Sequence, residues 1–232
     1  MLNIGFIPGI QHHPSDIRGL KEACGYFADI EHLERPSFIQ DEDTFQTWDA
    51  KVDTHYAEIS KHCDLIIGHS RGCRIALRLL ENKSFSGLVL LNPPAKRSKT
   101  TENNAETMLG TNAEALLSPL IRTLTPTQRR SMLLRHAMTS NRDYPRMLAE
   151  LKLHSKECDI SETIEAISEH TRMLIIDSLH DHWYVPIEPK PTRKIVTSDD
   201  ELDPRGHYDF VGHPEEIAKH IRAYCEELGL PT

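Results

Sequence analysis

The segment DLIIGHSRGC, residues 64–73, constrains the fold of this chain more than any other stretch. An apolar run leads into Gly68, and Ser70 is separated by one residue from a glycine on either side. The residues that follow, RIALRLL, have apolar side chains at helical spacing. The segment therefore predicts a buried strand, a tight turn that contains a serine, and a helix.

Short apolar runs and amphipathic helical runs alternate through most of the chain. The expected strands are residues 2–7, 29–33, 64–68, 86–94, 171–177 and 193–198. The expected helical stretches are residues 15–30, 44–62, 72–82 and 213–229. Strands that alternate with helices are typical of an α/β fold, so we expect a mostly parallel sheet of about six strands flanked by helices.

Residues 96–170 break this alternation with several short helical patterns, prolines and many polar residues. This segment is expected to be a helical cap inserted between two strands of the sheet. A chain of 232 residues can bury one sizeable core, so residues 1–232 are predicted to form a single domain that contains the cap.

Composition excludes several classes of protein. Hydrophobic residues make up 38% of the chain and charged residues 27%, and no apolar run approaches the roughly 20 residues of a membrane span. The N-terminus lacks the basic region of a signal peptide and is interpreted as a strand. The five scattered cysteines contain no Cys-x-x-Cys pair, which argues against a disulfide framework and favours a reducing cytoplasm.

A serine between two such glycines, after a strand and before a helix, is the pattern of a nucleophile elbow. The turn exposes the serine hydroxyl, and the backbone N–H of Arg71 would lie at a helix N-terminus, where it can stabilise an oxyanion. The alternative is a serine that caps an ordinary helix. The elbow is favoured because a matching base and acid follow later in the chain.

In this architecture the acid and the histidine follow the serine in that order. Asp181 comes shortly after the expected strand 171–177, and His207 lies between the strand 193–198 and the last helix. Asp177 and His213 are the competing residues. Asp177, at the strand's end, is interpreted as a loop or cap residue, and His213 as the start of a helix because Pro214 follows it.

Three segments resemble the α/β-hydrolase superfamily: GFIPG at residues 5–9, GHSRG at 68–72, and the loops HDHWYVP and RGHYDF that carry Asp181 and His207. The resemblance covers residues 2–95 and 171–230, and it would make the insertion the family's variable cap. It implies that Ser70 is the nucleophile, His207 the general base and acid, and Asp181 its orienting acid. Backbone amides of Arg71 and Ile10 would form the oxyanion hole.

The chain departs from the superfamily's pattern in three places. It begins at the oxyanion strand, so the sheet should lack the usual first strands. Pro8 replaces a common histidine, and the Asp181 loop has one extra residue before Pro186. The last two departures affect the oxyanion turn and the assignment of the acid.

The 14 histidines include two dense clusters, at residues 11–13 and 180–182, but none has the spacing of a catalytic metal site. No metal and no cofactor are therefore expected. His12 and His13 follow the oxyanion glycine and either line the substrate pocket or lie in a solvated loop. His69 is a further candidate for substrate binding, although a residue beside the nucleophile is more often a packed neighbour of the elbow.

Positive charge is concentrated in the insertion. Residues 96–156 contain eleven Lys and Arg against five Asp and Glu, a local net charge of +6 in a chain whose net charge is −8. Such a cap, including Arg129 and Arg130, could steer anionic substrates, an acidic acyl carrier protein or coenzyme A to the site. The alternative is a solvated helical face. Nucleic acid is a poor fit because the chain is acidic overall.

The sequence therefore predicts a cytoplasmic serine hydrolase that cleaves a carboxylic ester or thioester through an acyl-enzyme on Ser70. The resemblance extends to enzymes that hydrolyse the methyl ester of a pimeloyl chain on acyl carrier protein in biotin synthesis. Alternatives are an acyltransferase or a C–C bond hydrolase with the same triad, and a catalytically silent binding protein of the same fold.

Overall fold

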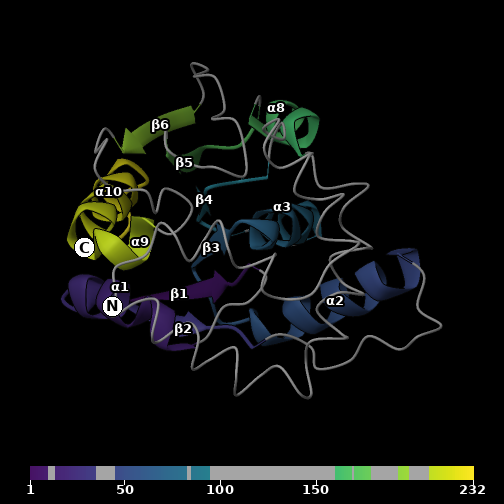
Figure 1. Cartoon of the computed structure of the whole chain (residues 1–232), viewed down its shortest axis with the longest axis horizontal. Helices are drawn as coiled ribbons and strands as arrows, with labels where there is room; N and C mark the ends of the chain where they lie inside the picture. The colour runs from purple at the N-terminus through teal and green to yellow at the C-terminus, as the bar shows by residue number, and fades with distance from the viewer. Residues whose placement is uncertain are drawn as a thin grey trace, which may run out of the picture.

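Six parallel strands form one sheet in the order β2-β1-β3-β4-β5-β6 (Figure 1). The computed structural model describes residues 1–9, 14–34, 45–82, 85–94, 160–168, 170–178, 193–198 and 209–232. The strands are β1 (Leu2–Ile7), β2 (Ala28–His32), β3 (Leu65–His69), β4 (Gly87–Leu91), β5 (Met173–Ser178) and β6 (Arg193–Ser198). The prediction of a parallel sheet of about six strands is confirmed.

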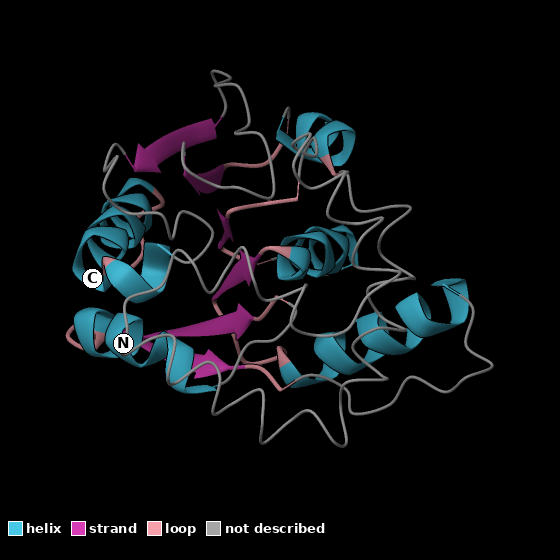
Figure 2. Cartoon of the chain, in the orientation of Figure 1, coloured by secondary structure: helices cyan, strands magenta, loops and turns pink. Residues whose placement is uncertain are grey.

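Helices cover both faces of the sheet (Figure 2). The 3₁₀ helix η1 (Pro14–Ile17) precedes α1 (Arg18–Cys24), and the later helices are α2 (Phe45–Ile59), α3 (Arg71–Asn82), α8 (Ser161–Ser168), α9 (Asp209–Gly212) and α10 (Pro214–Glu227). Figure 1 shows α1, α9 and α10 on one side of the sheet and α2, α3 and α8 on the other.

Alternate residues of each strand enter two separate cores. Leu65 and Ile67 of β3 pack in the core that α1, α9 and α10 cover, whereas Ile66 packs in the core of α2, α3 and α8. Successive strand side chains point to opposite faces, so a strand covered on both faces must be apolar at nearly every position. This explains why the strands appear in the sequence as continuous apolar runs.

The first helix is shorter than its helical pattern predicts. The pattern extends over residues 15–30, but α1 ends at Cys24 and β2 begins at Ala28. The turn between them is held by the N–H of Phe27, which donates to the carbonyl of Cys24 at 2.9 Å. The Leu2 N–H donates to the carbonyl of Phe27 at 3.1 Å, so strand pairing overrides the helical periodicity.

The described residues on either side of positions 95–159 are hydrogen-bonded to each other beside the sheet. The N–H of Ile160 donates to the carbonyl of Pro94, just after β4, at 3.0 Å. Ile160 and Ile164 of the following segment pack in the core of α2 and α3, so α8 belongs to the sheet's cover. The rest of the predicted cap, up to residue 159, lies outside the described residues.

The final helix is fixed to the sheet by Tyr224, whose ring is buried. Its hydroxyl donates to the carbonyl of Arg172 at 2.8 Å and accepts from the N–H of Leu88 at 3.2 Å. Burial raises the pKa of Tyr224 to about 12, so the hydroxyl stays neutral and keeps both bonds at physiological pH. Within the described ranges, no helix has the length and apolar character needed to cross a membrane.

The variant Tyr224→Phe tests this anchor. Removing the hydroxyl leaves the buried Leu88 N–H without its acceptor, and we expect the free energy of unfolding to fall by about 1–3 kcal/mol. Tyr26→Phe is the matched control because Tyr26 is 61% exposed, and its loss should be below about 0.5 kcal/mol. Urea unfolding measures both values. Equal stability of the two variants would contradict the anchoring role.

Candidate active site

Ser70 occupies a left-handed turn between β3 and α3. Its φ is 52°, and its side chain is almost buried, with 8% of the residue exposed. The Ser70 N–H donates to the carbonyl of Leu91 on β4 at 2.9 Å, and the Ser70 carbonyl accepts from the N–H of Cys73 at 2.9 Å. These bonds hold a conformation that costs a non-glycine residue about 1–2 kcal/mol. The predicted strand, turn and helix are therefore all present.

The two flanking glycines are required by contacts between backbone segments. A Cβ on Gly72 would lie 2.1 Å from the carbonyl oxygen of Ile7, at the end of β1. A Cβ on Gly68 would lie 2.7 Å from the Cα of Cys73. Any side chain at either position would force the backbone apart. The first turn of α3 is consequently pressed against the ends of two strands.

Gly9 lies directly against Ser70. A Cβ built on Gly9 would be 2.9 Å from the Cβ of Ser70 and 3.2 Å from the carbonyl oxygen of His69. The chain leaving β1 therefore passes beside the Ser70 side chain. Arg71 begins α3 on the other side of the serine, and the first N–H groups of a helix have no acceptor within it.

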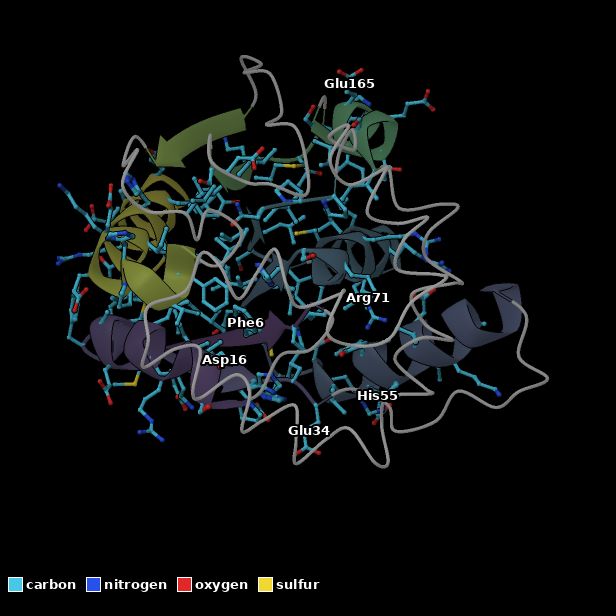
Figure 3. All side chains as sticks on the ribbon, in the orientation of Figure 1. Phe6, Asp16, Glu34, His55, Arg71 and Glu165 are labelled. Atoms are coloured by element: carbon cyan, nitrogen blue, oxygen red, sulfur yellow. The ribbon has the colours of Figure 1, made fainter. Side chains whose placement is uncertain are left out.

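Three rings connect α9 to the elbow. The Phe210 ring lies 4.8 Å from that of His69 and 5.5 Å from that of Phe6 on β1, measured between ring centroids. All three residues are fully or almost fully buried. Figure 3 labels Phe6 on β1, and Arg71 at the start of α3. His69 is thus placed as a packed neighbour of the elbow, and α9 is fixed close to Ser70.

Asp177 lies inside β5, not in the loop after it. The sequence interpretation as a loop or cap residue is wrong because Asp177 and Ser178 pair with Thr197 and Ser198 of β6, which extends the strand. Asp177 is 1% exposed and lies on the same face of the strand as Met173 and Ile175, which pack in the core of α2, α3 and α8. The α9 helix covers the opposite face.

Cys73 lies beneath the elbow on the same face as Asp177. Its Sγ donates to the carbonyl of Gly68 at 3.1 Å and lies 3.4 Å from the carbonyl oxygen of Leu91. Burial raises the pKa of the Cys73 thiol well above its usual value, and the Asp177 carboxylate raises it further. Cys73 therefore remains a thiol and supports the turn as a hydrogen-bond donor.

His213 lies at the start of the last helix, as predicted from Pro214, although its side chain makes no capping hydrogen bond. It occupies the N-cap position of α10, Pro214 is in the first turn, and Glu215 and Glu216 follow. Acidic residues in the first turn favour the helix through its dipole. His213 therefore begins a helix, as the sequence predicts.

Several predicted site residues lie outside the described residues: Ile10, His12, His13, Arg129, Arg130, Asp181 and His207. The structure describes Ser70 and its two neighbours in sequence, His69 and Arg71, and Arg71 is 5% exposed. No group of three or more His, Cys, Asp or Glu side chains in the described ranges could hold a metal ion.

Asn92, which follows β4, is a residue that the sequence interpretation missed. Its φ is 46°, and only 3% of the residue is exposed. Its position could have been noticed as the first polar residue after a buried apolar run and just before Pro93 and Pro94.

A sequence family described as an alpha/beta hydrolase of unknown function matches residues 47–125, which include the elbow. No curated protein matches the chain by sequence. Solved structures of hydrolases do match it in fold. A lipase-esterase related protein from Clostridium acetobutylicum has a TM-score of 0.70 at 15% identity, with 96% of this chain and 93% of that chain covered.

Two further structures have different activities in their names. A thermophilic esterase from Thermogutta terrifontis matches with a TM-score of 0.67 at 17% identity, covering 98% of this chain and 90% of its own. A meta-cleavage product hydrolase from Pseudomonas fluorescens matches with a TM-score of 0.68 at 13% identity, covering 98% and 91%. Identities this low show a shared fold and leave the substrate open.

The variant Gly72→Ala tests the contact between α3 and β1. Because its Cβ would overlap the Ile7 carbonyl, we expect a loss of at least about 3 kcal/mol in the free energy of unfolding. Gly25→Ala is the control, since a Cβ there meets backbone oxygens at 3.3 and 3.4 Å, and the change should stay within about 1 kcal/mol. Urea unfolding measures the free energy of unfolding of both variants. A Gly72→Ala protein as stable as the wild type would contradict the close contact between α3 and β1.

Proposed function

We propose that the chain is a member of the α/β-hydrolase superfamily and that it hydrolyses a carboxylic ester or thioester through an acyl-enzyme on Ser70; the partial family match and the shared fold support this. The observation that carries the proposal is the left-handed Ser70 turn between a buried strand and a helix, with the backbone of Gly9 against the serine. A strained polar residue at such a junction is typical of a nucleophile.

In the proposed reaction His207 takes the proton of the Ser70 hydroxyl as its oxygen attacks the acyl carbon. The N–H groups of Arg71 and Ile10 stabilise the oxyanion of the tetrahedral intermediate. The same imidazolium then protonates the leaving alcohol or thiol, which departs as the acyl-enzyme forms. His207 next activates a water that attacks the acyl carbon, and Ser70 is released with its proton restored.

The anchoring of α9 supports His207 as the base. His207 precedes Phe210 by three residues, and three residues of extended chain span at most about 11 Å. The Phe210 ring is 4.8 Å from the ring of His69, the residue just before the nucleophile. The short spacing in sequence from Phe210 is compatible with the proposed role of His207 as the base for Ser70.

The faces of the sheet favour Asp181 over Asp177 as the acid that orients His207. Asp177 packs on the α3 face, whereas α9, which follows His207, lies on the other face. A buried strand side chain cannot turn to the opposite face without a change of register. Asp181 follows the end of β5 by three residues, in the segment that leaves the carboxyl edge of the sheet.

The charge of the insertion supports an anionic substrate. The local net charge of +6 over residues 96–156, Arg129 and Arg130 included, would attract an acyl group with a free carboxylate or one delivered by coenzyme A or an acidic acyl carrier protein. The methyl ester of a pimeloyl chain on its carrier is one substrate of this class. His12 and His13 would lie beside the oxyanion turn, where they could contact the acyl group.

A second candidate function is C–C bond hydrolysis with the same triad. The meta-cleavage product hydrolase from Pseudomonas fluorescens shares the fold, which is the reason to test this reaction. Acyl transfer to an acceptor other than water would use the same acyl-enzyme. Turnover of simple esters compared with that of a meta-cleavage product separates these activities, and a protein that turns over neither would be a binding module.

Hydrolysis of a short-chain 4-nitrophenyl ester tests the proposal and the choice of acid together. We expect Ser70→Ala to abolish turnover and Asp181→Asn to lower kcat by about 10²- to 10⁴-fold with little change in stability. Asp177→Asn is the matched control, and it should retain most of the kcat while it changes stability through the buried site beside Cys73. The reverse pattern for the two aspartates would assign the acid to Asp177.

A further inference from the structure

Two residues other than glycine have positive φ in the part of the chain that the structure describes, and they are neighbours across the sheet. Ser70 follows β3 with a φ of 52°, and Asn92 follows β4 with a φ of 46°. The pairing of β3 with β4 ends at His69 and Leu91, so Ser70 and Asn92 are the next residues on the two strands. Adjacent strands lie about 4.8 Å apart.

The backbone between these two residues is held from several directions. The Leu91 carbonyl accepts from the N–H of Ser70 at 2.9 Å and lies 3.4 Å from the Sγ of Cys73. The N–H of Asn92 donates to the carbonyl of Ile176 on β5 at 2.8 Å. The position of Asn92 relative to Ser70 is therefore fixed by three strands and the first turn of α3.

A turn alone does not explain an asparagine at this position. Glycine adopts a positive φ at no steric cost, whereas the Cβ of asparagine is strained there. A buried asparagine must also satisfy the hydrogen bonds of a carboxamide with two donors and two acceptor sites. Asn92 is 3% exposed, so its carboxamide is removed from water at a position that is next to Ser70 across the strand pair. A strained, buried polar residue next to a reacting group is a reason to assign the side chain a role.

We propose that the Asn92 side chain is a positioning residue for the reaction at Ser70, holding the serine and its turn in the conformation that attacks the acyl carbon. This role rests on the proposed function and goes beyond the triad. Asn92 acts through Ser70 and does not bind the acyl group, so its loss should slow acylation and leave substrate binding unchanged.

The matched pair Asn92→Gly and Asn92→Ala separates the carboxamide from the backbone strain. Both variants lack the carboxamide, but glycine tolerates the positive φ and alanine does not. The measurements are the rate constant of the acylation burst with 4-nitrophenyl acetate, the substrate dissociation constant from its dependence on substrate concentration, and the melting temperature of each protein.

We expect both variants to lose about 10- to 100-fold in the rate constant of the burst, with the substrate dissociation constant obtained from the burst within about twofold of the wild type. The melting temperature should fall more for Asn92→Ala than for Asn92→Gly, because only alanine also strains the positive φ. An Asn92→Gly protein with the wild-type burst rate would overturn the positioning role and leave Asn92 as a turn residue, while the proposed hydrolysis would stand. A wild type with no burst and no turnover would overturn both.

Discussion

The approach of α3 to the end of β1 is the contact on which the rest of the site depends. With Gly72 so close to the Ile7 carbonyl that no Cβ fits, the N-terminus of α3 meets the point where the chain leaves β1 for Gly9. Ser70 must therefore turn sharply between β3 and α3, and it does so in a left-handed conformation beside Gly9. One backbone contact thus sets both the strained serine and the place of the proposed oxyanion hole.

The residues that surround the strained turn are divided between the two faces of the sheet. One face holds the buried polar cluster of Cys73 and Asp177 under the elbow, next to apolar side chains of α3. The other face receives Phe210 of α9 between Phe6 and His69. Since the polar cluster and the α9 anchor are on opposite faces, each can be packed without competition for space around Ser70.

The local parts of this arrangement are predictable from the sequence. The spacing of Gly68, Ser70 and Gly72 after an apolar run predicts the turn because only close backbone packing requires small residues there. The place of Asp177 is not predictable, since the end of β5 depends on pairing with β6, which lies elsewhere in the sequence. Asn92 was missed for a similar reason, because a left-handed φ at a non-glycine residue follows from the strands around it and leaves little local pattern.

The most direct test of the account is the intact mass of the protein after treatment with a fluorophosphonate, followed by mapping of the modified peptide. We expect a single adduct on Ser70 of the wild type and none on the Ser70→Ala protein. Labelling of the His207→Ala protein should be much slower because the serine loses its base. A folded wild-type protein that stays unmodified, or that reacts equally well without His207, would contradict the claim that Ser70 is an activated nucleophile.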